Sequence, residues 1–111
     1  MPNGASHASA ASLNPSFDPI LLSQARLGIV TVLVTRPEAT FSDLKEILGL
    51  TQGNLGIHLG KLEEVGYVEI RKEFVARKPR TTTRITEKGR ASFLAHVDRL
   101  AAVARRAQDN R

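Results

Sequence analysis

A strongly basic segment runs from Arg71 to Arg84 and holds the residues best suited to bind an anion. It contains six cations and one acid, so its excess of charge equals the net charge of the whole chain, +5. The cations are Arg71, Lys72, Arg77, Lys78, Arg80 and Arg84, and the acid is Glu73. Such a cluster suits a row of phosphates, because each neutralised phosphate releases condensed counterions. The alternative is a solvated hairpin whose charges keep it soluble and protect its edge.

Side chains that can read DNA bases lie just before this segment, on an expected helix over 51–65. Leu55, Leu59 and Leu62 fall at i, i+4 and i+7 and mark its buried face. At about 100° per residue, the outward side carries Gly53, Ile57, Gly60, Lys61 and Glu64, with Asn54 beside it and Gln52 at the entry end. Glutamine and asparagine amides can pair bidentately with adenine, and an apolar side chain can meet a thymine methyl. Both amides could instead cap the start of the helix.

Two short helices joined by a tight turn would position these side chains. Leu44, Ile47 and Leu48 share one face of the first helix. Gly49 suits the left-handed residue that ends a helix, and Thr51 can cap the next one. A short turn with glycine between two helices with inward leucine faces is typical of a helix-turn-helix.

An apolar helix is expected on the N-terminal side of this pair. Asp18-Pro19 is a typical helix start, with a capping carboxylate followed by proline, and Arg36-Pro37 would end the helix near Thr35. This helix is apolar on both sides, so we expect it to contact both the core and a partner surface. Ala39-Thr40 can form a short strand, and residues 1–17 have the composition of a disordered tail.

A β-hairpin and a long terminal helix are expected after the helix pair. Residues 67–74 begin with alternating polarity and 81–85 are rich in β-branched residues, which predicts two strands joined by a turn over 76–80. Thr86 can cap a last helix that runs to about residue 107, and 108–111 would be frayed.

The apolar faces of the first and last helices predict a dimer. A terminal helix this apolar on so small a domain needs a second chain to cover it. The residues expected in this interface are Ile20, Leu21, Leu27, Phe93, Val97, Leu100 and Ala104. We expect His96 to be a partly buried residue of the same interface.

The remaining polar candidates favour structural roles. His58 lies at the edge of the leucine face, where packing or a phosphate contact is favoured over metal binding because no second ligand stands at helical spacing. Arg26 lies among apolar residues, where pairing with an acid of the next helix, Asp43 or Glu46, is favoured over a phosphate contact. We expect no metal site and no cofactor.

The composition limits the class of protein and its partners. The 111 residues suffice for one domain, expected over 18–107, and the pI of about 10.2 predicts nucleic acid first and an anionic membrane surface second. No apolar run approaches the roughly 20 residues of a membrane span, and no secretory signal is visible. The lack of cysteine excludes disulfides and thiolate metal sites and fits a cytoplasmic protein.

Two segments together resemble the winged helix-turn-helix transcriptional regulators, near the multiple-antibiotic-resistance (MarR) and arsenical-resistance (ArsR) types. They are LTQGNLGIHLGKLEEVGYVEI at 50–70 and ARKPRTTTRITEKG at 76–89. The resemblance implies a mainly α fold with a small β-hairpin (α+β), in which 67–85 is the wing and the N- and C-terminal helices dimerise. It also implies a homodimer that binds double-stranded DNA, regulates transcription and often responds to a small-molecule effector.

The DNA-binding residues expected on this basis lie on the recognition helix, 51–65, and the wing. They are Thr51, Gln52, Gly53, Asn54, Ile57, His58, Lys61, Arg77, Lys78, Arg80 and Thr82. Nothing resembles a nucleophile elbow or a phosphate loop, so no enzyme activity is expected. The alternative function is a winged-helix module that binds another protein without sequence-specific DNA binding.

The recognition helix departs from the family pattern at Gly56, Ile57 and Gly60, where relatives tend to carry serine or a cation. Each interior glycine costs roughly 1 kcal/mol relative to alanine. We expect the bare surface to bring the helix backbone closer to the groove floor, which would shift specificity toward few side chains and DNA shape. The alternative is drift toward weaker binding.

Overall fold

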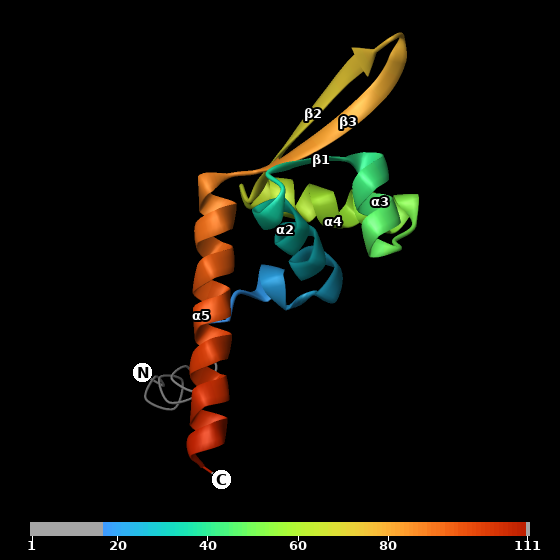
Figure 1. Ribbon diagram of the computed structural model, residues 1–111. Helices are drawn as coiled ribbons and strands as arrows, with labels where there is room; N and C mark the ends of the chain where they lie inside the picture. Colours follow the sequence, from blue (N-terminus) through green and yellow to red (C-terminus); the bar gives the residue numbers. More distant parts are fainter. Residues whose placement is uncertain (1–16, 111) are drawn as a thin grey trace, which may run out of the picture.

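Four α-helices and one short 3-10 helix surround the base of a three-stranded antiparallel sheet in the computed structural model, which describes residues 17–110 (Figure 1). The elements are η1 (Pro19–Leu22), α2 (Gln24–Thr35), β1 (Glu38–Thr40), α3 (Phe41–Leu48), α4 (Gln52–Glu64), β2 (Val68–Val75), β3 (Lys78–Ile85) and α5 (Glu87–Asp109). The predicted mainly α fold with a small β-hairpin is confirmed. The expected disordered tail lies, apart from Phe17, outside the described residues.

The first helix is interrupted at Ser23, so the prediction of one continuous helix is wrong. Asp18 caps η1 by accepting a hydrogen bond from the Ile20 amide at 2.9 Å. Ser23 then adopts an extended conformation and caps α2 by accepting from the Arg26 amide at 3.2 Å. Serine favours such a cap over a helix interior because its hydroxyl bonds readily to nearby backbone. The predicted end at Thr35 is confirmed.

The helix pair has the predicted caps, but Ile47, expected on the inward face of its first helix with Leu44 and Leu48, is 51% exposed. The Thr40 hydroxyl caps α3, and Asp43 completes a capping box with the Thr40 amide. Gly49 ends α3 in the left-handed region at φ 64°, which favours glycine. Thr51 caps α4 by accepting from the Asn54 amide at 3.1 Å. These contacts satisfy backbone groups at the helix ends and fix the angle between α3 and α4.

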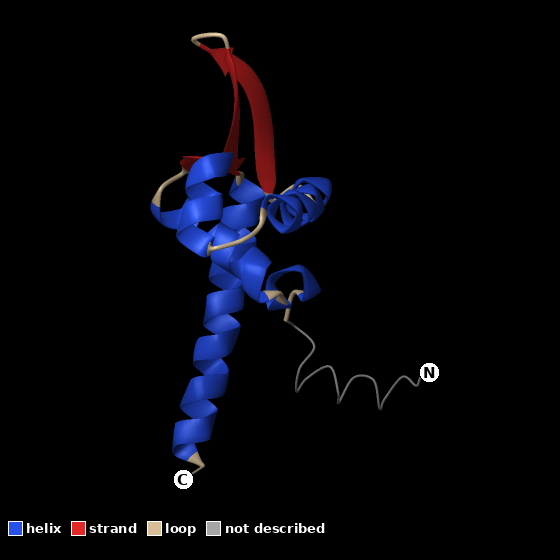
Figure 2. Ribbon diagram, turned by 90° about the vertical axis from the view of Figure 1, so that its right-hand side faces the viewer, coloured by secondary structure: helices blue, strands red, loops and turns tan. Residues whose placement is uncertain are grey.

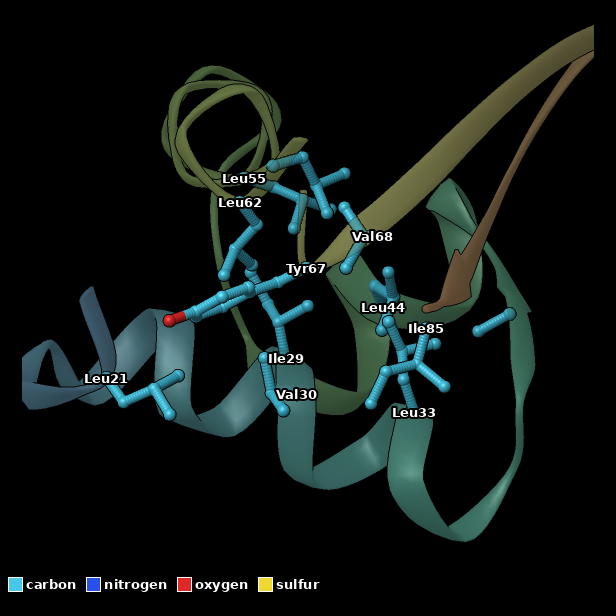
Figure 3. Close-up of a cluster of buried hydrophobic side chains, with 12 residues drawn as sticks. Leu21, Ile29, Val30, Leu33, Leu44, Leu55, Leu62, Tyr67, Val68 and Ile85 are labelled. Atoms are coloured by element: carbon cyan, nitrogen blue, oxygen red, sulfur yellow. The ribbon is translucent and has the colours of Figure 1, made fainter. Parts of the chain in front are cut away.

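One hydrophobic core joins the helix pair to α2 and to the base of the sheet (Figure 3). The predicted leucine face of α4 is buried, with Leu55 and Leu62 at 0% exposure and Leu59 at 2%. The other elements contribute Ile29, Val30, Leu33, Leu44, Val68 and Ile85. Burial of each such side chain stabilises the fold by about 1.5–3 kcal/mol, so the core fixes which side of α4 faces solvent.

The strands pair in the order β1-β3-β2, and the hairpin between β2 and β3 is longer and tighter than predicted. Its register runs from Val68 opposite Ile85 to Val75 opposite Lys78, which leaves a turn of two residues. Ala76 and Arg77 both have positive φ, 52° and 68°. Two such residues are typical of the primed turns whose twist matches paired strands. The predicted turn over 76–80 is therefore too long, because residues 78–80 belong to β3.

The molecule is elongated, with extents of 58 × 34 × 25 Å. The hairpin rises from one end of the helical body and α5 projects from the other (Figures 1 and 2). The helix α5 continues to Asp109 rather than ending near residue 107. None of the helices in residues 17–110 is long and apolar enough to cross a membrane.

The start of α5 packs tightly against the residue that leads into β2. Gly89 is buried, and a Cβ added there would lie 2.2 Å from the carbonyl oxygen of Tyr67. The Tyr67 hydroxyl donates a hydrogen bond to the Asp18 carboxylate. Burial raises the pKa of the Tyr67 phenol, and the hydrogen bond to Asp18 raises it further. These contacts hold the N-terminal segment, the hairpin and α5 together.

Candidate nucleic-acid interface

The solvent side of α4 carries the side chains predicted to read bases. Ile57 is 63% exposed, and Gln52, Asn54 and Lys61 are also exposed. The helix cap comes from the hydroxyl of Thr51, not from the amide side chains of Gln52 or Asn54. Both amides therefore lie on the surface with their pairing groups available for a partner.

Three glycines leave part of the α4 backbone uncovered by side chains. Apart from the glycine itself, its chain neighbours and the adjacent backbone of α4, no heavy atom lies within 4 Å of where a Cβ on Gly53, Gly56 or Gly60 would be. An alanine at any of them would therefore meet no steric obstacle in the protein alone. Packing inside the fold does not explain why glycine stands at these positions.

Arg26 and His58 tie α4 to the N-terminal segment. The Arg26 Nε donates to the carbonyl oxygen of Ile20 at 2.9 Å, and its Nη1 lies 3.2 Å from His58 Nδ1. A guanidinium can only donate, so Nδ1 accepts and the other ring nitrogen, Nε2, carries the proton. The expected pairing of Arg26 with an acid is wrong. Asp43 instead accepts from Arg36 at 3.3 Å.

Two of the wing cations are paired with acids. Arg71 lies 3.4 Å from Glu38, and Arg84 lies 3.1 Å from Glu69. All four side chains are about half exposed or more, so each pair contributes at most about 1 kcal/mol to stability. Within residues 17–110, the wing cations without an ion pair are Lys72, Arg77, Lys78 and Arg80. The wing thus concentrates its available positive charge toward its outer half.

A groove joins the outer wing to the start of α4. Its volume is about 750 Å³, and its walls include Gln52 from α4, Lys45 from α3 and both Lys78 and Arg80 from β3. A neighbouring groove of about 660 Å³ lies between the wing and the glycine side of α4, and Lys72 lines it. The helix and the wing therefore border two neighbouring grooves, each lined by at least one cation.

Lys45 also belongs to this surface, although it was not among the predicted DNA-binding residues. Lys45 is an exposed residue near the end of α3, and it lines the same groove as Gln52. An exposed cation on the first helix of a helix-turn-helix was the available signal, but helical spacing alone did not relate it to the wing.

Thr82 does not belong to the exposed surface. It is 7% exposed and lies on the central strand, between Thr40 of β1 and Arg71 of β2. The burial contradicts the expected DNA contact, because a buried hydroxyl cannot reach a phosphate. The β-branched residues of 81–85 do form a strand, as predicted. The alternation of polar and apolar residues did not reveal that β1 pairs with this part of β3.

The residues expected at a dimer interface divide into buried and exposed groups. Leu21 is 0% exposed in the protomer core, so its expected place in an interface is wrong. Ile20, Leu27 and Phe93 are partly buried against the same core. Exposed apolar side chains remain at Leu22 (63%), Leu94 (52%), Val97 (41%), Leu100 (46%) and Val103 (48%), and Ala104 is exposed beside them.

His96 lies inside the protomer and not at its surface. It is 2% exposed and packs edge-on against Phe17, with ring centroids 5.8 Å apart. The expected position in a partly exposed interface is therefore corrected. Residues 17–110 contain no group of three or more His, Asp or Glu side chains arranged to hold a metal ion.

Known proteins share this architecture. A family model described as a winged helix DNA-binding domain matches residues 25–104. The uncharacterized protein MJ0432 of Methanocaldococcus jannaschii is 41% identical over 78 residues, which cover 70% of this chain and 85% of that protein. The structure of a transcriptional regulator homologue from Pyrococcus horikoshii OT3 matches with a TM-score of 0.72 and 39% identity, over 77% of this chain and 84% of that one.

A DNA-bound structure is also similar. FabT of Streptococcus pneumoniae, solved in complex with DNA, matches with a TM-score of 0.60 and 25% identity, over 80% of this chain and 62% of that one. The helix pair, the hairpin and these matches agree on one assignment. The chain belongs to the winged helix DNA-binding domain family and resembles solved winged helix transcriptional regulators.

Proposed function

We infer that the chain binds double-stranded DNA as a homodimer, with α4 in the major groove and the wing on phosphates and the minor groove. The observation that carries this proposal is the groove of about 750 Å³ bordered by Gln52 on one side and by Lys78 and Arg80 on the other. The amide of Gln52 could therefore contact a base while Lys78 and Arg80 contact phosphates of the same duplex. The complex of FabT with DNA supports the same partner for a chain of this fold.

The side chains of α4 divide into base-reading and phosphate-binding groups. Gln52 and Asn54 would pair with adenine edges, and Ile57 would contact a thymine methyl. Lys61 is an exposed point charge suited to a phosphate. The Nε2–H of His58 is directed away from Arg26 and can donate to a phosphate, since Nδ1 is already occupied.

The glycines of α4 would let the DNA approach the helix backbone closely. Because no side chain or other element of the fold lies near these three glycines, their use fits a partner that approaches the helix backbone closely. Gly60→Ala tests this reading in a binding titration. Close approach requires weaker DNA binding by a variant whose fold is at least as stable. Unchanged or tighter binding would show that the glycines do not serve close approach.

The dimer is supported by an uncovered apolar stripe. Val97, Leu100 and Ala104 are spaced i, i+3 and i+7 on one face of α5 and are exposed, with Val97 at 41% and Leu100 at 46%. The second half of α5 projects beyond the helical body (Figure 1). Burying this stripe against its two-fold copy would remove it from water. Two recognition helices would then meet half-sites about 34 Å apart on a near-palindromic site.

A filter-binding titration combined with selection from a random duplex pool tests the function. The proposal requires an affinity that falls steeply with salt and a selected sequence with two-fold symmetry. An interaction module that binds only other proteins is the alternative. It would be favoured if the selected pool showed no sequence preference over bulk DNA.

The proposal places the protein in the cytoplasm, where it would meet the DNA that it regulates. The family resemblance extends it to a small-molecule effector that alters DNA binding. Such an effector would raise the melting temperature, because any ligand that binds only the folded state stabilises it. A thermal-shift screen of small aromatic acids and cations would identify one.

A further inference from the structure

The outer end of the wing exposes apolar side chains among cations. Phe74 is 76% exposed, Val75 is 40% exposed, and Pro79 is the cross-strand neighbour of Phe74. The cations Arg77, Lys78 and Arg80 lie in the same stretch. Single exposed apolar residues are ordinary on protein surfaces, but a cluster on a projecting element usually marks a binding site.

The hairpin geometry presents Phe74 and Pro79 as one pair. In antiparallel strands, hydrogen-bonded and non-hydrogen-bonded pairs alternate, and the pair that flanks a two-residue turn is hydrogen-bonded. Val75 and Lys78 flank the turn, so the pair of Phe74 and Pro79 is of the other kind. A proline fits there because it has no N–H to donate. Side chains of such pairs are also the closest together.

The wing carries this pair well away from the helical body. Thr83, the cross-strand neighbour of Ile70, is fully buried, whereas every residue from 71 to 80 is exposed. Phe74 lies four residues beyond Ile70, or about 13 Å along an extended strand. No helix accompanies the outer hairpin in Figure 2. A minor groove is about 6 Å wide and 7.5 Å deep, so the ribbon end is long enough to enter one.

We propose that Phe74, backed by Pro79, is an apolar wedge that enters the minor groove and partly unstacks a base step. The inference rests on the proposed function, because the wing must first lie on duplex DNA. The surrounding cations favour DNA over an apolar protein surface, since phosphates line both sides of the groove whose interior would receive the ring. Apolar wedges of this kind kink DNA by about 20–90° toward the major groove.

The wedge also predicts a preference for certain sequences beneath the wing. Pyrimidine–purine steps such as TA unstack most easily. A site bound with a kink would therefore favour such a step at the wing position without any hydrogen bond to its bases. This specificity would add to the base contacts of α4.

The test uses the full chain and a duplex selected by it from a random pool. Fluorophores at the duplex ends report bending, and 2-aminopurine at the step beneath the wing reports unstacking. The variant Phe74→Ala removes the wedge, and Phe74→Leu keeps an apolar side chain at the same position as the matched control. Phe74 is 76% exposed, so its replacement leaves the core intact, and thermal unfolding checks this.

We expect Phe74→Ala to bind more weakly by roughly 10- to 100-fold for each wing that loses its ring, from the apolar burial lost, with less bending and no rise in 2-aminopurine fluorescence. Phe74→Leu should retain most of both signals. Unchanged bending and affinity in Phe74→Ala would overturn the wedge while leaving DNA binding intact. So would a lower apparent mass of Phe74→Ala in light scattering, because the ring would then contact protein. Lack of salt-dependent binding by the wild-type chain would instead refute the proposed function.

Discussion

Replacing Lys78 with alanine should change how steeply DNA binding depends on salt. Each phosphate contact contributes about 0.9 to the slope of log K against log salt concentration. Four wing cations have no acidic partner within residues 17–110, so a dimer would carry eight and the wing would contribute about 7 to the slope. Lys78 occurs twice in a dimer, and Lys78→Ala should therefore reduce the slope by about 1.8.

The matched control is Arg84→Ala, which removes one positive charge from the same strand. Arg84 lies next to the last residue of β3, at the base of the wing, and pairs with Glu69 at 3.1 Å, so its loss should leave the slope nearly unchanged. Binding measured by fluorescence anisotropy over a series of salt concentrations gives both slopes. Equal slopes for the two variants would refute the reasoning, because the wing would then act through overall charge and not through specific phosphate contacts.

Three further predictions concern stability and assembly. Gly89→Ala should lower the free energy of unfolding by about 1–3 kcal/mol, because its methyl group would collide with the Tyr67 carbonyl oxygen, whereas Gly60→Ala should raise it by about 1 kcal/mol. Equal denaturation midpoints for these two variants would contradict this packing. Tyr67→Phe should cost about 1 kcal/mol through loss of the hydrogen bond to Asp18. The raised pKa of Tyr67 stabilises the folded state below about pH 10, and this contribution is lost as the pH rises through the folded-state pKa, so urea unfolding of Tyr67→Phe should show a smaller alkaline decline. Leu100→Asp should turn a dimer into monomers in light scattering while leaving the melting of the protomer core intact, and a retained dimer would rule out the α5 stripe as the interface.

The helix pair could be predicted from the sequence because local rules govern it. Thr40, Gly49 and Thr51 stand at the positions where caps and left-handed residues are needed, and the leucine spacing identifies the buried face. Ser23 was missed because the apolar residues on both sides of it continue a helical pattern. One helix ends at Ser23 and the next starts there with a single hydrogen bond from the Arg26 amide to the Ser23 hydroxyl, and the spacing of apolar residues does not reveal such a bond.

Contacts distant in sequence were the harder part. The burial of Thr82 depends on β1, which is 42 residues away at Thr40, and the partner of Arg26 depends on how α4 crosses α2. The length of the hairpin was underestimated because Pro79 and its basic neighbours resemble a turn. Neither Ala76 nor Arg77 is a typical residue for a left-handed turn, so the true turn carried no recognisable pattern.

The hydrogen bonds of Arg26 have a consequence for the energetics of binding. One guanidinium holds both the Ile20 carbonyl and the His58 ring, so α4 cannot roll about its long axis without breaking a bond. The orientation of its solvent side is thus preorganised before any duplex arrives. If α4 reads DNA as proposed, less conformational freedom would be lost on association, and more of the contact energy would be left to discriminate one operator from another.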